Sequence, residues 1–171
     1  MLAVRDGDLD AFGKLVEGHQ AAAWSTAYRF LGDAAEAEDI AQQAFLNILE
    51  AADRYEPSAK FTTYLYRVVT RLCIDRSRRK QPLYTDDLPD RATPTPSPAE
   101  AAEQRERDEA VRAALAKLPD RQRMVVVLRY YEGLSGSEIA AAMGTSVKAI
   151  ERLLARARAG LEQNLAGFLG K

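Results

Sequence analysis

Residues 135–161 read SGSEIAAAMGTSVKAIERLLARARAGL, the pattern of two helices joined by a tight turn. Ser135, followed by Glu138 three residues later, forms a capping box, which begins a helix by satisfying its free backbone amides. Gly144 ends that helix, because glycine adopts the left-handed backbone conformation without steric cost. Ser146 is placed to cap a second helix. The stretch therefore predicts a helix-turn-helix.

The second helix of this unit has two chemically different sides. Its apolar side carries Val147, Ile150, Leu154, Ala157 and Leu161. The opposite side is polar and basic, as expected for a helix that enters the major groove of DNA. Its predicted DNA-binding residues are Ser146, Lys148, Glu151, Arg152, Ala155 and Arg156, with Arg158 beside them. A solvated surface helix would show the same amphipathic pattern, but the two caps and the glycine between them favour DNA binding.

Charge is unevenly distributed along the chain. The 171 residues carry a net charge of -1, which by itself would not attract nucleic acid. Six of the seven charged residues from Arg67 to Lys80 are basic, however, and so are four of the five from Lys148 to Arg158. An acidic stretch, 86–109, separates them. The pattern indicates two local surfaces for phosphate within one chain.

Several classes of protein are excluded by what the sequence lacks. Cys73 is the only cysteine, so no disulfide can form within the chain, and we expect a buried thiol. His19 is the only histidine, and there is no glycine-rich phosphate loop and no Ser/His/Asp set. We therefore expect no enzyme, no catalytic residue, no metal and no cofactor. No apolar segment reaches about 20 residues, the length of a membrane span, which predicts a cytoplasmic protein without membrane insertion.

Residues 81–98, QPLYTDDLPDRATPTPSP, divide the chain. Five prolines among serine, threonine and aspartate leave no helical period, which predicts a flexible linker. The predicted organisation is one domain at 1–80 and a second at 99–171. Because helical periodicity dominates both and no strand pattern competes with it, the predicted fold class is all-α, with two small helical domains.

Apolar periodicity predicts three helices before the linker and two more ahead of the helix-turn-helix. They are expected at Asp8–Leu31, Ala34–Arg54, Lys60–Lys80, Ala99–Leu118 and Asp120–Glu132. The residues expected to face inward are, in chain order, Leu9, Phe12, Leu15, Val16, Ala23, Ala27 and Leu31, then Ile40, Ala41, Ala44, Phe45, Ile48, Leu49 and Ala52, then Phe61, Leu65, Val68, Val69 and Leu72, then Val111, Ala114, Leu115 and Leu118, and finally Met124, Val125, Val127, Leu128 and Tyr131.

The helix predicted at 60–80 combines basic and aromatic residues on one side. Lys60, Tyr64, Arg67, Arg71 and Arg78 share this side, and Thr63 lies next to it. Aromatic rings stack on exposed bases while arginines hold the backbone, a combination suited to single-stranded or melted nucleic acid. The alternative is a solvated basic face with Phe61 and Tyr64 in the core.

Four segments resemble motifs of bacterial sigma factors of the extracytoplasmic-function type, the group 4 members of the sigma-70 family. They are GDLDAF at 7–12, AEDIAQQAFL at 37–46, KFTTYLYRVVTRLCIDRSRRK at 60–80, and LPDRQRMVVVLRYYEGLSGSEIAAAMGTSVKAIERLLARAR at 118–158. They follow the family's order across a proline-bearing linker. The resemblance covers nearly the whole chain and implies a region 2-like domain of three helices followed by a region 4-like helix-turn-helix domain.

The resemblance also implies a function and a set of partners. Such proteins direct RNA polymerase to promoters, and an anti-sigma factor commonly holds them inactive. The implied contacts with core RNA polymerase, on the clamp helices of its largest subunit, are Glu38, Asp39, Gln42, Gln43 and Asn47. The residues implied to melt and hold the minus-10 promoter element are Lys60, Phe61, Thr63, Tyr64, Arg67, Arg71 and Arg78. The helix that begins at Val147 would read the minus-35 element.

The chain departs from the family pattern at three places. Many relatives carry tryptophan at the position of Tyr64 and asparagine at that of Arg71, and residues 151–153 differ from the basic residue, serine and arginine often found there. Stacking on a base is retained by Tyr64, whereas the promoter sequence cannot be carried over. An alternative function is a helix-turn-helix regulator that acts without docking on polymerase and whose amino-terminal half senses a signal or dimerises.

Overall fold

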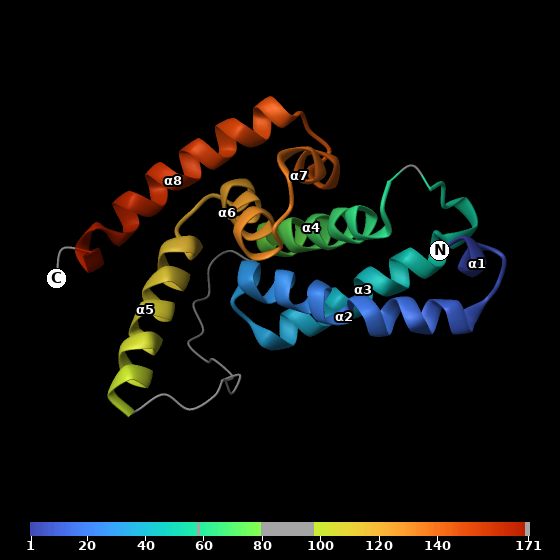
Figure 1. Cartoon of the computed structure of the whole chain (residues 1–171), viewed down its shortest axis with the longest axis horizontal. Coiled ribbons are helices and arrows are strands. Elements are labelled where there is room, and N and C mark those ends of the chain that lie inside the picture. Colours follow the sequence, from blue (N-terminus) through green and yellow to red (C-terminus); the bar gives the residue numbers. More distant parts are fainter. Residues whose placement is uncertain (58, 80–97, 170–171) are drawn as a thin grey trace.

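The computed structural model describes residues 1–57, 59–79 and 98–169, and within these residues the regular secondary structure is helical (Figure 1). This agrees with the predicted all-α fold class. The molecule is elongated, and the first and last helices lie at opposite ends of it (Figure 1). Of the predicted linker at 81–98, only Pro98 is described, as the first residue of a helix.

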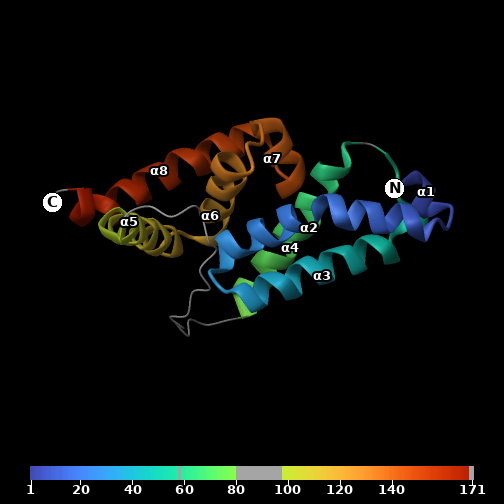
Figure 2. The same ribbon diagram turned by 60° about the horizontal axis from the view of Figure 1, so that its bottom comes forward.

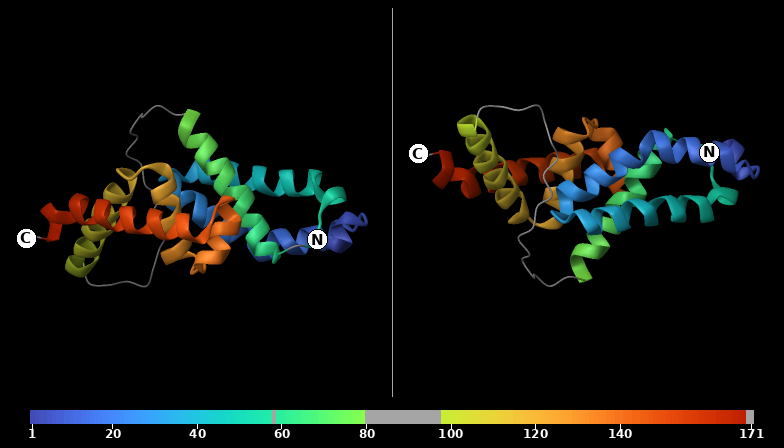
Figure 3. Two further views of the ribbon diagram at one scale, coloured as in Figure 1. Left: turned by 90° about the horizontal axis from the view of Figure 1, so that it is seen from above. Right: turned by 90° about the horizontal axis from the view of Figure 1, so that it is seen from below.

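The amino-terminal module contains helices α1 (Leu2–Arg5), α2 (Leu9–Leu31), α3 (Ala34–Glu50) and α4 (Phe61–Arg79), with a 3-10 turn, η1 (Ala52–Arg54), after α3. Helices α2 and α3 lie side by side, and α4 crosses both obliquely (Figures 2 and 3). The helix predicted at 34–54 therefore ends four residues early, in a tighter turn. The short α1 had no counterpart among the predicted helices.

Local capping accounts for where α2 and α3 begin and end. The Asp8 carboxylate accepts a hydrogen bond from the backbone amide of Ala11 at 2.9 Å, and the Asp33 carboxylate accepts one from that of Glu36 at 2.9 Å. Gly32 adopts a φ of 76°, a left-handed conformation that lets the chain leave α2 and start α3 within two residues. Each of these signals lies within a few neighbouring residues of the chain.

Alanines and larger apolar residues alternate in the core of this module. Ala23, Ala27 and Ala44 are fully buried, which lets α2 and α3 approach closely. The larger buried side chains are Phe30, Ile40, Ile48, Leu65 and Val69, and Cys73 is buried among them as predicted. The predicted inward position of Leu9 is wrong: it is 69% exposed, because it is the first residue of α2 and precedes the part of that helix covered by others.

The carboxy-terminal module contains α5 (Pro98–Ala116), α6 (Asp120–Val126), a π-helical segment η2 (Val127–Tyr131), α7 (Gly136–Met143) and α8 (Val147–Leu169). The helix predicted at 120–132 thus changes from α to π geometry halfway along. Helix α8 lies on the far side of α6 and α7 from α2 and α3 (Figures 1 and 2). It packs against α5, α6 and α7.

The predicted helix-turn-helix is present at α7 and α8. Ser135 and Glu138 form the reciprocal capping box, and Gly144 ends α7 with a φ of 62°. Ser146 Oγ accepts from the backbone amide of Ala149 at 3.2 Å, as the predicted cap of α8. Ile150 and Ala157 are fully buried on the predicted apolar side of α8.

Three positions of this module are more exposed than their periodicity suggested. Val147 is 43% exposed, because it is the first residue of α8 and only part of its side chain is covered. Tyr131 is also 43% exposed and holds the guanidinium of Arg29 over its ring at 4.7 Å. Val111 of α5 is 37% exposed. The prediction that these three residues face inward is wrong.

The two modules share one hydrophobic core. Helix α4 packs against α7 and α6, and the cluster of buried side chains runs from Phe30 and Leu65 to Met124, Leu128 and Ile139 without a break. The sequence left open whether the modules pack together, and the structure shows that they do. Among the described residues, no helix is both long and apolar enough to cross a membrane.

Candidate nucleic-acid and protein interfaces

The predicted DNA-reading side of α8 is open to solvent. All six predicted residues are exposed: Ser146, Lys148, Glu151, Arg152, Ala155 and Arg156. Arg152 and Arg156, together with Arg121 of α6, line a shallow hollow of about 370 Å³. Because Ile150 and Ala157 anchor the opposite side of the helix, these cations lie on a rigid support, as a groove-reading helix requires.

The basic side of α4 faces the carboxy-terminal module. Arg67 donates to the backbone carbonyl of Ala141 in α7 through Nε at 3.2 Å and Nη2 at 3.1 Å. The ammonium of Lys60 lies 3.7 Å from a carboxylate oxygen of Glu138, also in α7. Arg71 is exposed and pairs loosely with Asp75 at 3.9 Å. Two of the four predicted basic DNA contacts, Arg67 and Lys60, are therefore engaged by α7.

The aromatic residues of α4 are partly covered. The ring of Phe61 lies against that of His19, with centroids 5.0 Å apart, and the ring of Tyr64 lies against that of Tyr55 at 5.4 Å. Both pack on the core, as the alternative interpretation of this helix expected. Thr63 is only 7% exposed, so its predicted contact with DNA is not available in this arrangement.

A cationic hollow of about 260 Å³ lies at the seam between the modules. It is lined by Arg67, Arg71 and Arg78 from α4 and by Arg121 from α6, with Asp75 as the acidic member. The neighbouring Thr70 hydroxyl is buried without a hydrogen-bond partner. Arg121 also lines the hollow beside α8, so the two hollows have this cation in common.

The polar side of α3 lies away from the carboxy-terminal module and carries no basic residue. Glu38, Asp39, Gln42 and Gln43 are exposed, and Asn47 is half-buried. Gln43 donates to the amide oxygen of Asn47 at 2.8 Å, and Gln42 lies 3.5 Å from Glu38, so the side chains form an ordered row. Repulsion of phosphate by the two carboxylates makes this row unsuited to binding DNA.

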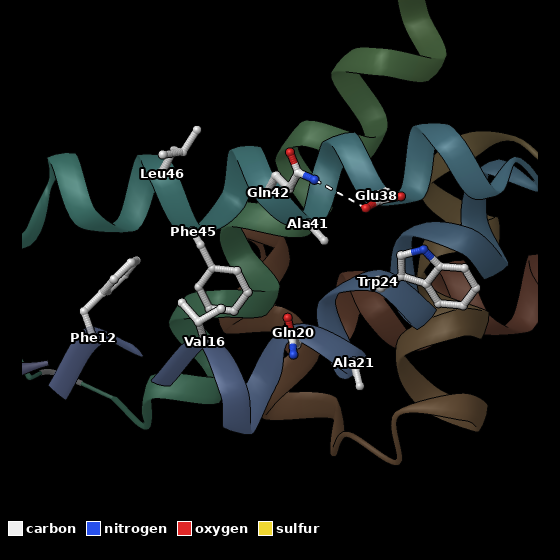
Figure 4. Close-up of a pocket in the computed structure, with 10 residues that line it drawn as sticks. All are labelled: Phe12, Val16, Gln20, Ala21, Trp24, Glu38, Ala41, Gln42, Phe45 and Leu46. Carbon is white, nitrogen blue, oxygen red and sulfur yellow. Dashed lines mark hydrogen bonds between the residues drawn. The ribbon is translucent and has the colours of Figure 1, made fainter. Parts of the chain in front are cut away.

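A groove between α2 and α3 borders this polar row (Figure 4). It has a volume of about 660 Å³, and its apolar lining includes Phe12, Val16, Trp24, Phe45 and Leu46. Leu46 is 53% exposed. The sequence analysis missed Trp24 and Leu46. The available signal was a leucine on the otherwise polar side of α3, which marks an apolar patch within a polar surface.

Glu132 is a further residue that the sequence analysis did not single out. Its buried carboxylate accepts a hydrogen bond from Arg29 Nη1 at 3.0 Å and another from the Tyr66 hydroxyl at 2.9 Å. Burial, followed by this hydrogen bond, raises the pKa of the Tyr66 phenol. Arg29 and Tyr66 belong to the amino-terminal module, so one carboxylate joins the two modules. No periodic pattern indicates such a contact.

Two family profiles match this arrangement, one for each module. The profile of Sigma-70 region 2 matches residues 15–82, and that of Sigma-70, region 4 matches residues 108–161. Because one profile matches each module, in this order along the chain, the protein is of the sigma-70 class.

Individual relatives and solved structures agree with this class. The ECF RNA polymerase sigma factor SigW of Bacillus subtilis is 34% identical over 173 residues, covering 95% of this chain and 92% of SigW. The solved structure of CnrH in complex with the cytosolic domain of CnrY is 30% identical, with a TM-score of 0.71, over 96% of this chain and 94% of CnrH. RpoE of Bartonella quintana, solved with the anti-sigma factor NepR, shares the fold at 18% identity with a TM-score of 0.70, over 91% of this chain and 97% of RpoE. The chain belongs to the extracytoplasmic-function family of RNA polymerase sigma factors.

Proposed function

We propose that this protein binds core RNA polymerase and directs it to specific promoters, melting the minus-10 element and reading the minus-35 element. The observation that carries the proposal is the presence of two exposed surfaces of opposite charge within one chain. An exposed cationic side on α8 suits DNA, and an exposed acidic side on α3 suits a protein partner. In the proposed organisation, a region 2-like domain spans 1–80, a linker 81–98 and a region 4-like domain 99–171.

The proposed docking surface for polymerase is the polar row of Glu38, Asp39, Gln42, Gln43 and Asn47. Its partner would be the clamp helices of the polymerase's largest subunit. The bordering groove of Figure 4 supports this role, because protein interfaces combine an apolar centre with a polar rim.

The proposed minus-35 contacts are the six exposed residues Ser146, Lys148, Glu151, Arg152, Ala155 and Arg156. Arginine pairs well with guanine in the major groove and glutamate accepts from cytosine, so Arg152 and Glu151 are the candidates for base reading. Lys148 and Arg156 would hold phosphates.

The proposed minus-10 contacts are on α4. Exposed Arg71 and Arg78 would hold the backbone of the melted strand, and Tyr64 would stack on an unpaired base. Lys60, Phe61, Thr63 and Arg67 complete the proposed set. Their partners within the chain have to be released first, since Arg67 and Lys60 are bound to α7 and Thr63 is buried.

The proposal includes three further points. The protein has no catalytic activity of its own, because its role is to direct the polymerase to promoters. It works in the cytoplasm, where that partner acts. An anti-sigma factor would regulate it, which is supported by the complexes in which the similar CnrH and the structurally similar RpoE were solved with CnrY and NepR.

Run-off transcription with core polymerase on a library of genomic promoters tests the function and reports the preferred sequence. We expect transcripts that depend on the protein and start at a defined set of promoters. Asp39→Arg should abolish co-purification with core polymerase, because it places a cation within the acidic row. The matched control is Glu17→Arg, an equal charge change at an exposed position of α2.

An alternative function as a self-sufficient helix-turn-helix regulator makes the opposite prediction. The free protein would then bind duplex DNA tightly and specifically, and core polymerase would add nothing. If neither protein-dependent transcripts nor co-purification with core were found, the sigma-factor function would have to be given up.

A further inference from the structure

Helix α8 carries an arginine on each flank of the side that is proposed to read bases. Arg156 and Arg158 are two positions apart, which places them roughly 200° apart around an α-helix. Both are exposed, and Ala157 between them is fully buried. The two arginines therefore project from opposite flanks of the solvent-facing side of α8.

A second cation, Arg121, lies beside the flank of Arg156. Arg121 is the second residue of α6, is exposed, and lines the hollow of about 370 Å³ next to α8. The other residues around this hollow are Thr145, Ala149, Arg152, Leu153 and Arg156. Among these described lining residues, three including Arg121 are arginines and none is acidic, so the hollow is suited to a phosphate group.

The opposite flank is supported by a tyrosine from η2. The hydroxyl of Tyr130 accepts a hydrogen bond from Arg158 Nε at 3.1 Å. This bond uses one of the five N–H groups of the guanidinium and leaves the other four for a further acceptor. Because Tyr130 is 55% exposed, the contact lies at the surface of the protein and not in its core. Tyr130 is thus placed to orient Arg158.

The tyrosine belongs to the π-helical segment, where the helix is locally wider. The backbone amide of Glu132 donates to the carbonyl of Val127, five residues earlier, at 3.2 Å. Val127 and Leu128, in the same segment, are fully buried. Turns of this kind are frequent at functional sites. The irregular turn and the contact of Tyr130 with α8 occur at the same place.

A helix in the major groove has a sugar-phosphate strand on each side of it. The groove is about 12 Å wide, and a helix with its side chains measures about 10–12 Å across. Residues near the start of a recognition helix reach the base edges, and Arg152 lies within the first two turns of α8. Arg156 and Arg158 follow at least one full turn later. Their positions on the two flanks suit the two strands.

We propose that Arg121 and Arg158 bind phosphates of the two DNA strands on either side of α8, and that Tyr130 is the positioning residue for Arg158. The ligand at both places is a phosphodiester group of duplex DNA. Neither contact reads sequence, because all phosphates of the duplex are chemically alike. The inference rests on the proposed binding of the minus-35 duplex by α8. All three elements involved, α6, η2 and α8, belong to the carboxy-terminal module.

The first experiment measures binding of the protein, in complex with core polymerase, to a duplex carrying a minus-35 sequence found by run-off transcription. Arg121→Ala and Arg158→Ala should each lower the affinity about tenfold at low salt, because each removes a hydrogen-bonded charge pair. Each should also reduce the slope of log affinity against log salt concentration by about 0.9, the value for one phosphate. Arg5→Ala is the same change at an exposed position of α1, at the other end of the molecule, and should alter neither quantity (Figure 1).

A duplex with one altered base pair separates phosphate contacts from base contacts. The ratio of the affinities for the preferred and the altered duplex should be the same in Arg121→Ala as in the wild type, whereas Arg152→Ala should lower it. A scan with single neutral methylphosphonates should find a position that weakens the wild type about tenfold and does not weaken Arg121→Ala further. That result would identify the phosphate that Arg121 binds.

The second experiment tests the positioning role of Tyr130. Tyr130→Phe removes the hydroxyl and keeps the ring, and it should lower the affinity about threefold in the wild type. In an Arg158→Ala background the same substitution should have no effect, since the group that it orients is absent. A tyrosine that only supports the fold would lower the affinity equally in both backgrounds. Circular dichroism establishes that each variant is folded.

Unchanged affinity and salt slope in Arg121→Ala or in Arg158→Ala would overturn the contact assigned to that arginine, and an equal loss in Arg5→Ala would overturn both. A failure of the proposed function is recognised separately, because the wild-type protein would then support no transcription with core polymerase. The salt slope of the free full chain on a duplex of random sequence decides the matter in that case. A slope lowered by about 0.9 in each variant supports the phosphate contacts, whereas equal slopes, or no binding by the wild type, refute them.

Discussion

Ile150→Ala should strongly destabilise the carboxy-terminal module, because this side chain attaches α8 to the rest of the protein. Ile150 is 0% exposed and belongs to the core shared by both modules. The substitution removes three buried carbon atoms, worth about 0.8 kcal/mol each in transfer from water. The cavity left behind adds to this cost, which brings the expected loss in free energy of unfolding to about 3–4 kcal/mol.

Val147→Ala is the matched comparison on the same helix. Val147 is also β-branched but 43% exposed, so its truncation should cost less than about 1 kcal/mol. Both substitutions gain a similar amount of helix propensity, and their difference therefore isolates burial. Urea unfolding followed by circular dichroism measures both. If Ile150→Ala cost no more than Val147→Ala, the packing of α8 described here would be wrong.

Three other predictions concern single residues. Burial raises the pKa of the Cys73 thiol to about 12, so this thiol should resist a thiol reagent at pH 8 until urea unfolds the protein. The free energy of unfolding that this shift contributes is present below the thiol's ordinary pKa and is lost as the pH rises toward 12. Rapid labelling of the folded protein would contradict this prediction. Ser135→Ala should cost about 1 kcal/mol by removing a helix cap. Hydrogen bonds from Ser135 hold the pKa of the Glu138 carboxyl below its usual value, so this stabilisation is present above the ordinary glutamate pKa and should fade as pH falls through the lowered one, which thermal unfolding between pH 7 and about pH 3 would reveal. Arg152→Ala, in the complex with core polymerase, should weaken binding to a minus-35 duplex by about 1–3 kcal/mol. The control Lys14→Ala, on the amino-terminal module, should leave this binding unchanged. Equal effects of the two substitutions in a filter-binding assay would show that the duplex does not bind at Arg152.

The packing of α4 against α7 affects how substitutions on α4 have to be interpreted. Arg67 is a proposed contact with the minus-10 strand and also binds α7 through its hydrogen bonds to the Ala141 carbonyl. Substituting Arg67 would therefore change both the binding of DNA and the packing of α4 against α7. Residues such as Arg71, which is exposed and only loosely paired, separate the two effects better.

The positions at which helices begin and end were determined largely by the sequence alone. Asp8, Asp33 and Ser135 each bond a backbone amide three residues away, and Gly32 and Gly144 adopt left-handed conformations, so every one of these signals is complete within a few neighbouring residues. The exposed cationic side of α8 followed in the same way from helical periodicity. Two of the departures, at Leu9 and Val147, fall on first residues of helices, where periodicity continues but coverage by other helices does not. The other two, at Val111 and Tyr131, depend on which helices lie alongside them, which periodicity does not indicate.

Only the tertiary structure decided what covers each helix side. Periodicity showed that α4 has an apolar and a basic side, but the basic side meets α7, where Arg67 binds Ala141, 74 residues further along the chain. The contacts of Glu132 with Arg29 and Tyr66 likewise join residues that no local pattern relates. A capping or periodic signal reflects forces between neighbours in the sequence, whereas packing between modules depends on the shapes and charges of surfaces that exist only after each module has folded.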